Sequence, residues 1–377
     1  MIYFLIFFAL VACVTKYDAF NFKKRQQIFN AFVCVLIVIC GIRYRVGTDT
    51  IAYMDEYNGA LHDLSDRYQI GWILILKFFK SINANFYFVQ FAIATIINWG
   101  VCRFINSSKK MYIFSGLLLY YSLLFPAWNF EILRQSICIS LFLIALPYIK
   151  KKLSIYFILI CIASTIHEMS LILLFVPLFM KIQLNKLMLL CFTSLICLII
   201  AIAPFLREQF IQLAISISFL EERATYYYSE VDDAATFSFM SYFFNVLLNI
   251  AIPLCFIFMD KNNKHNGNDY YILCILSIFT YALSMMIPML YRVNYYFSLF
   301  TLLLFIDIIF TIVCKISSKR NTRQLLYALI LFSLILVKGR IYISKNYYGI
   351  PMYTHYYPYT NIFNEYKVHD REKLLFY

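Results

Sequence analysis

Long apolar stretches separated by short polar segments dominate the chain. The apolar stretches lie at residues 1–15, 26–42, 85–104, 111–126, 132–149, 153–181, 186–204, 241–259, 270–288, 295–314 and 324–339. Most are near, or somewhat below, the roughly 20 residues that an α-helix needs to cross a bilayer. The pattern therefore predicts an all-α, polytopic integral membrane protein that forms a single membrane domain over residues 1–377.

The stretch 68–84 does not have the form of a crossing. Its apolar run from Gln69 to Phe79 is too short to span a bilayer, and Lys77 and Lys80 interrupt it. We expect a short helix here that does not cross.

The stretch 153–181 is long for one crossing and short for two. It contains Thr165-Ile166-His167-Glu168, which has the form of a capping box. In this motif the Thr hydroxyl and the Glu carboxylate bind the free N–H groups at a helix start. The motif predicts a broken helix near residue 165, made of two shorter helices that enter and leave the same side.

The distribution of basic residues predicts the orientation. With those two assignments, 18 of the 33 Lys and Arg residues fall in six short loops on one side: 16–25, 103–110, 150–152, 181–186, 260–269 and 315–323. Short loops rich in Lys and Arg lie on the cytoplasmic side. The count is then about 11 to 12 transmembrane helices with both termini outside. The external segments are 43–84, 205–240 and 339–377.

Composition excludes several classes of protein. Hydrophobic residues make up 62% of the chain and charged residues only 14%, against about 25% charged in soluble domains. That balance excludes a cytosolic enzyme and a disordered chain. The net charge of +13 is spread between apolar stretches, so we expect no nucleic-acid partner. The 11 Cys lie in or beside apolar stretches, which argues against a disulfide framework and a thiolate metal site. We expect no metal and no cofactor.

The first candidate constellation runs from Arg43 to Asp49. If this segment is extended, Arg43 and Arg45 face the same way, and Gly47 allows a turn. Thr48 or Asp49 can cap a helix from about Thr50 to Gly59. Two guanidinium groups beside a helix N-terminus can hold a phosphate or pyrophosphate. The alternatives are that both arginines anchor a span end at the headgroups, and that Asp49 is either a plain cap or a base.

The second constellation is centred on Arg134. Asn129 is expected to cap a helix that continues into an apolar span, which places Arg134 over one turn inside. A charge there costs at least ~2.5 kcal/mol on insertion scales, so an intramembrane arginine is a functional candidate. The alternative is a pair between Glu131 and Arg134 at i, i+3.

The third and fourth candidates lie later in the chain. His167 is expected as the second residue of the half-helix that begins at Thr165, where irregular backbone lines a cavity. The alternative is a core histidine bonded by a neighbouring helix. Arg292 precedes Tyr295 and Tyr296, which share its helix face and suit sugars and phosphates. The alternative there is an interfacial aromatic belt with an anchoring arginine.

The ordered set of these motifs resembles the EpsG family, which comprises Wzy-type polysaccharide polymerases of bacterial envelopes. The motifs are Arg-Tyr-Arg-x-Gly-Thr-Asp-x-x-x-Tyr from Arg43, then Arg134-Gln135, then His167-x-x-Ser170, then Arg292-x-x-Tyr-Tyr. The resemblance covers nearly the whole chain from Arg43 onward. Two positions depart from common family forms: Gln69 stands where Glu is frequent, and Ser170 follows His167 at three residues rather than two.

The resemblance implies a membrane glycosyltransferase that joins undecaprenyl-pyrophosphate-linked repeat units at the outer face of a bacterial inner membrane. It implies a multi-pass protein whose site faces the periplasm or exterior, with membrane lipids and a chain-length regulator as further partners. The implied roles are catalysis for His167 and Asp49, pyrophosphate binding for Arg43, Arg45, Arg134 and Arg292, and substrate binding for Tyr53, Gln135, Tyr295 and Tyr296. An O-antigen ligase, a membrane O-acyltransferase and a flippase or other transporter remain alternatives.

The topology makes a first testable prediction. Cysteines introduced at Asp63 and Asn83 in a Cys-free background should both react with a membrane-impermeant thiol reagent added from outside. If 68–84 crossed instead, the basic loops at Lys109 and Lys150 would move to the exterior, against the charge bias. Labelling at only one of the two positions would contradict this topology.

Overall fold

The computed structural model describes residues 2–18, 22–59, 69–216, 239–260, 267–344 and 351–364. Over these ranges the regular structure is helical, and the β-structure is limited to two isolated bridges. The prediction of an all-α polytopic membrane protein is confirmed. Seven helices are long and apolar enough to cross a membrane, and five shorter apolar helices accompany them. The number of crossings stays a prediction.

The described chain forms two compact units. The first contains the residues up to Leu174, together with 313–344 and the segment from Pro351 onward. The second contains 175–312. Each unit is described by itself, and the expectation of a single membrane domain stays a prediction.

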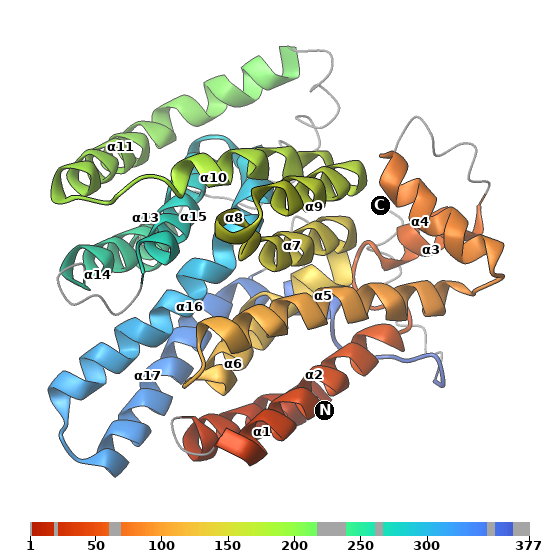
Figure 1. Cartoon of the computed structure of the whole chain (residues 1–377), viewed down its shortest axis with the longest axis horizontal. Helices are drawn as coiled ribbons and strands as arrows, with labels where there is room; N and C mark the ends of the chain where they lie inside the picture. The colour runs from red at the N-terminus through yellow and green to blue at the C-terminus, as the bar shows by residue number, and fades with distance from the viewer. Residues whose placement is uncertain are drawn as a thin grey trace. The chain divides into compact units, whose positions relative to one another are not determined.

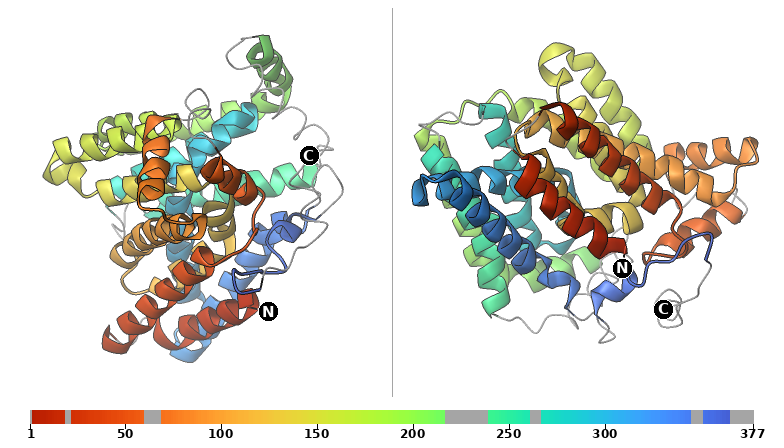
Figure 2. Two further views of the ribbon diagram at one scale, coloured as in Figure 1. Left: turned by 90° about the vertical axis from the view of Figure 1, so that its right-hand side faces the viewer. Right: turned by 90° about the horizontal axis from the view of Figure 1, so that it is seen from below.

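The first unit is a set of neighbouring antiparallel and crossing helices in which α2 packs on α5, α5 on α7, α7 on α9, and α9 on α4 (Figure 1). Helix α1 packs on α6 and α17 (Figure 2). The elements are α1 Ile2–Tyr17, α2 Phe22–Gly41, α3 Thr50–Asn58, α4 Ile70–Ser81, α5 Phe86–Ser108, α6 Ile113–Leu123, the π-helix η1 Ala127–Glu131, α7 Leu133–Ala145, α8 Tyr148–Lys151, α9 Leu153–Ile166, the 3₁₀ helix η2 Glu168–Phe175, α17 Arg320–Gly339, η5 Arg340–Tyr342 and η6 Met352–His355.

The second unit is built on α15, which packs against α11 and α14. Hydrogen bonds also join α15 to α16: Ser277 bonds Thr301, and the Tyr270 hydroxyl donates to the Phe300 carbonyl at 3.0 Å. The elements are α10 Val176–Phe179, α11 Lys186–Ser216, α13 Phe239–Val246, the π-helix η3 Leu247–Ala251, α14 Ile252–Asp260, α15 Asn268–Met286, η4 Pro288–Leu290 and α16 Tyr291–Ile316, whose last residues belong to the first unit.

Two residues near the end of α1 and the start of α2 contact the segment between α5 and α6. Arg25 donates to the carbonyls of Lys110 and Met111, and Asp18 accepts from the backbone N–H of Ser115 at 2.8 Å. Burial raises the pKa of the Asp18 carboxyl to about 7, and the bonds to Ser115 oppose that rise. Asp18 and Arg25 therefore lie beside the segment from Lys110 to Ser115, and the orientation of these loops stays a prediction.

The predicted break near residue 165 is present, but its cause is different from the one expected. Helix α9 continues to Ile166, His167 has extended backbone (φ −149°, ψ 114°), and η2 begins at the next residue. Thr165 does not cap a new helix, because its hydroxyl donates to the Ile162 carbonyl within α9. The capping-box interpretation is wrong: Thr165 lies in the last turn of the first helix, and His167 is the junction itself.

A short helix at 68–84 is also present, as α4. Its 12 residues extend for about 18 Å, less than the ~30 Å hydrocarbon core. Its first turn lies against the end of α9, since a Cβ added to Gly71 would lie 2.3 Å from the Thr165 Oγ1 atom. A glycine at this position allows α4 to begin directly beside the broken helix. That α4 does not cross stays a prediction.

Candidate functional site

The loop that follows α2 is held by hydrogen bonds from two distant parts of the chain. The side-chain amide of Gln90, on α5, donates to the carbonyls of Gly41 at 2.8 Å and Arg43 at 3.0 Å. From the C-terminal segment, the Thr360 carbonyl accepts from the Tyr44 N–H at 3.0 Å. Backbone groups inside a protein must be hydrogen-bonded, and this loop gains its partners from outside itself.

The same C-terminal segment makes two further backbone bonds to the loop. The Gly47 N–H donates to the His355 carbonyl, and the Ile362 N–H donates to the Ile42 carbonyl, both at 3.0 Å. The structure therefore brings two segments predicted to be external, 43–84 and 339–377, into direct contact. Nothing in the sequence pattern indicated this pairing.

The segment from Arg43 to Asp49 is not extended throughout, contrary to expectation. Arg45 has a φ of 50° and Gly47 a φ of 95°, so the chain reverses between them. A Cβ on Gly47 would lie 2.5 Å from the Phe130 carbonyl oxygen. Both this close approach and the positive φ therefore favour glycine at this position. As a result Arg43 and Arg45 occupy different environments.

Arg43 is fully buried. Its Nη1 donates to the Cys40 carbonyl at 2.7 Å, and its guanidinium carbon lies 5.3 Å from the centre of the Phe130 ring. Burial lowers the pKa of Arg43 to about 10, which still leaves it charged at neutral pH. Its Nε and Nη2 have no hydrogen-bond partner among the described residues. Arg43 is not a headgroup anchor, since such a side chain would reach the surface.

Arg45 and Asp49 lie nearer the surface. Arg45 is partly exposed and stacks over the Tyr44 ring at 5.5 Å, while Asp49 is exposed. Helix α3 starts at Thr50 as predicted, but Asp49 makes no side-chain cap. Its backbone is helical rather than extended (φ −83°, ψ −5°), so its carboxylate is not aimed at the helix start and instead accepts from Thr48 at 3.4 Å.

Arg134 lies at the start of α7. The sequence pattern predicts it over one turn inside this helix, and that placement is wrong. The reason is that Asn129 does not cap this helix. Asn129 is buried inside η1, where it accepts from Asn98 at 2.7 Å and donates to the Tyr120 hydroxyl at 2.9 Å. The π-helix continues to Glu131, so α7 begins at Leu133.

The Arg134 side chain contacts two others, the predicted residue Tyr53 and Gln69, which departs from the common family form. Its Nη1 lies 3.4 Å from Gln69 Oε1, at the start of α4, and its side chain bonds the Tyr53 hydroxyl on α3. Burial raises the pKa of Tyr53, and the Asp49 charge raises it further. Arg134 therefore contacts Gln69 and Tyr53, and Asp49 acts on the Tyr53 hydroxyl through its charge.

His167 approaches the same helix one turn further on. Cys138, four residues after Arg134, donates to the Ala163 carbonyl at 3.1 Å and also contacts Ser170 and the backbone of His167. Residues four apart lie about 6 Å apart on one helix face. His167 itself is buried, and its carbonyl accepts from the Ser170 hydroxyl at 2.8 Å. The helix break thus lies beside the Arg134 face of α7.

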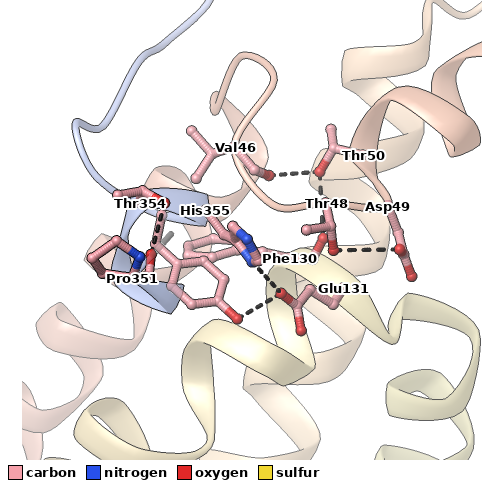
Figure 3. A network of polar contacts seen from close by, with 10 residues as sticks. Val46, Thr48, Asp49, Thr50, Phe130, Glu131, Pro351, Thr354 and His355 are labelled. Atoms are coloured by element: carbon pink, nitrogen blue, oxygen red, sulfur yellow. Dashed lines mark hydrogen bonds and ion pairs between the residues drawn. The ribbon is translucent and has the colours of Figure 1, made fainter. Parts of the chain in front are cut away.

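Glu131 forms a network with the C-terminal segment that the sequence did not indicate (Figure 3). The Tyr356 hydroxyl donates to Glu131 Oε1 at 2.6 Å, and His355 Nδ1 lies 3.9 Å from the same oxygen. Glu131 thus has partners in the C-terminal segment, and an ion pair with Arg134 is not its sole role among the described residues. No spacing or motif signals them, because more than 220 residues separate the partners.

The remaining predicted residues are placed as follows. Gln135 is buried in α7. Arg292, Tyr295 and Tyr296 lie in α16, in the second unit. Arg292 is exposed, whereas Tyr296 is fully buried, so the Tyr296 ring is not part of the surface that Arg292 presents. Among the described residues no cluster of three or more His, Cys, Asp or Glu could hold a metal ion.

The fold and these residues define a multi-pass helical membrane protein that gathers arginine, tyrosine and histidine side chains where its helices break or begin. The EpsG family model matches residues 26–361, and the chain belongs to this family, whose members are membrane proteins related to polysaccharides. Comparisons with curated proteins and with solved structures found no match.

Gln90 provides a test of how the loop after α2 is held. Replacing Gln90 with Leu removes the donor from two carbonyls, and each buried unbonded group costs roughly 1–3 kcal/mol. We expect the amides of residues 42–47 to exchange with deuterium at least about tenfold faster, as follows from ~1.4 kcal/mol. Gln27→Leu, at an exposed position of α2, is the control. Unchanged exchange in Gln90→Leu would show that the C-terminal segment alone holds the loop.

Proposed function

We propose that this protein is a polysaccharide polymerase that joins lipid-linked repeat units by glycosyl transfer. The observation that carries the proposal is the environment of Arg134: a guanidinium at the N-terminus of α7, beside Gln69 and Tyr53, one turn from the broken helix at His167. A helix N-terminus and an arginine together favour a phosphate or pyrophosphate group.

In this proposal the donor is a growing glycan on undecaprenyl pyrophosphate. The pyrophosphate is the leaving group, and Arg134 stabilises the charge that develops on it. Arg45 is the second cation available near the surface. Arg43 is buried with its guanidinium carbon 5.3 Å from the centre of the Phe130 ring, and its role in pyrophosphate binding stays part of the proposal. Arg292 lies in the second unit, and its role in pyrophosphate binding stays a prediction.

The acceptor is a hydroxyl group on the next lipid-linked unit. A base must take its proton as it attacks, and His167 and Asp49 were the candidates from sequence. One base and a ready-made leaving group suit a single direct displacement, so we expect inversion at the anomeric carbon. The site would face the outer side of a bacterial inner membrane, and a chain-length regulator would act as a partner.

A glycan ladder from a deletion strain tests the reaction. Loss of a polymerase should leave a single repeat unit on the lipid carrier, because units are still made and exported but not joined. Loss of a ligase or a flippase should leave no repeat unit on the final acceptor, and loss of an acyltransferase should leave the ladder intact. Either of the last two patterns would reject the polymerase assignment.

Arg134 variants then test the site. Arg134→Lys keeps the charge but cannot make two parallel N–H bonds to phosphate oxygens. Losing one charge-assisted hydrogen bond removes roughly 1.5–3 kcal/mol, so polymer yield should fall at least about tenfold. Arg134→Met should abolish the ladder while the protein accumulates in the membrane.

Arg103→Lys is the matched control, since Arg103 is exposed on α5 and stacks over Trp99. It should keep a full ladder. A full-length ladder from Arg134→Met, with membrane protein at the normal level, would remove Arg134 from the site.

A further inference from the structure

His355 is a buried imidazole whose position is fixed but whose ring nitrogens are not bonded. His355 as a whole residue is 8% exposed, and neither its Nδ1 nor its Nε2 atom has a hydrogen-bond partner among the described residues. Its backbone is held, because its carbonyl accepts from the Gly47 N–H. Buried polar atoms are almost always bonded, so an unbonded imidazole in an ordered segment indicates a ligand or a catalytic role.

The Glu131 carboxylate lies close to this imidazole. His355 Nδ1 lies 3.9 Å from Glu131 Oε1, and the neighbouring Tyr356 hydroxyl donates to that same oxygen at 2.6 Å (Figure 3). The Glu131 side chain keeps 21% exposure. A carboxylate beside one ring nitrogen favours a proton on that nitrogen and leaves the lone pair of the other nitrogen free to accept one. Catalytic hydrogen bonds are often long before substrate binds.

The position along the chain links this pair to Arg134. Glu131 ends η1 and Arg134 is the second residue of α7, so a single junction carries both. Cys138, which contacts Ser170 and the His167 backbone, lies beyond Arg134 in the opposite direction. Along the chain, the residue paired with His355 therefore precedes Arg134, and the residue that contacts the break at His167 follows it.

We propose that His355 is the catalytic base that takes the proton from the acceptor hydroxyl, and that Glu131 is the residue that positions it. This assignment rests on the proposed function. The acceptor oxygen forms a bond to the anomeric carbon as its proton passes to His355 Nε2. The bond from the anomeric carbon to the pyrophosphate oxygen breaks, and its electron pair leaves with the pyrophosphate, beside Arg134. His355 then releases the proton to solvent.

The assignment explains why the C-terminal segment is folded back onto the loop after α2. Its hydrogen bonds to Gly47 and Ile42 hold His355 close to Glu131, although the two residues lie far apart in the sequence. In the proposed reaction the base is held in position by Glu131, which precedes Arg134 by three residues, and the leaving group lies at Arg134.

The experiment uses the full-length protein in lipid nanodiscs, with the lipid-linked repeat unit that accumulates in the deletion strain. The rate of the first coupling is measured as kcat and KM, and undecaprenyl pyrophosphate binding is measured separately. His355→Gln should lower kcat by at least about 100-fold, as expected for loss of a general base. Its Kd for undecaprenyl pyrophosphate should stay within twofold of the wild-type value. Arg134→Met should instead lose that binding.

Three further variants separate a catalytic role from a structural one. His355→Ala should regain turnover when imidazole is added, which no merely structural residue would do. Glu131→Gln should lower kcat with KM unchanged. Glu131→Asp keeps the carboxylate, so its kcat should lie between those of Glu131→Gln and the wild type. Tyr353→Phe, at an exposed position of η6, is the control and should behave as wild type.

The outcomes distinguish this assignment from the proposed function. Wild-type protein that couples no repeat units would overturn the proposed function. Wild-type protein that couples them, with His355→Gln at an unchanged kcat, would overturn the assignment of His355 alone. So would His355→Ala that binds undecaprenyl pyrophosphate normally but gains nothing from imidazole.

Discussion

The backbone just past the end of α2 takes many of its hydrogen-bond partners from distant parts of the chain, and the first unit is arranged around that need. Gln90 bonds the carbonyls of Gly41 and Arg43, and the segment 351–364 bonds Ile42, Tyr44 and Gly47. Each bond is ordinary in strength, but leaving any of them unmade inside a protein is costly. A loop that would otherwise be free is therefore held in one shape, and so are the side chains it carries.

The second organising feature is the π-helix that precedes α7. The amide of Asn129 is bonded to Asn98 and to the Tyr120 hydroxyl, and these buried polar groups satisfy one another in an apolar setting. The extra residue of a π-helix shifts the start of α7, which brings Arg134 to a helix N-terminus. π-Helices are often found at functional sites for this kind of reason. Here it places a cation where a helix start can help bind an anion.

The proposed chemistry uses the consequences of both features. The fixed loop carries Arg45 and Asp49, the junction carries Glu131 and Arg134, and the broken helix brings His167 toward the same face of α7. The buried guanidinium of Arg43 and the imidazole of His355 both have nitrogen atoms with no hydrogen-bond partner in the part of the chain that the structure describes. Rigid backbone with unbonded polar atoms is an arrangement suited to binding a ligand.

The sequence by itself determined what local pattern can determine. Apolar lengths gave the all-α membrane fold, the short helix near 68–84 and the break near 165, because each depends on residues close together in the chain. It also indicated Arg43, Arg134 and His167 as unusual. It could not show that Arg43 is buried, that Asn129 bonds Asn98 instead of capping α7, or that His355 meets Glu131. Those facts depend on segments that only tertiary packing brings together, and hydrophobic periodicity carries no information about which polar groups will pair across such distances.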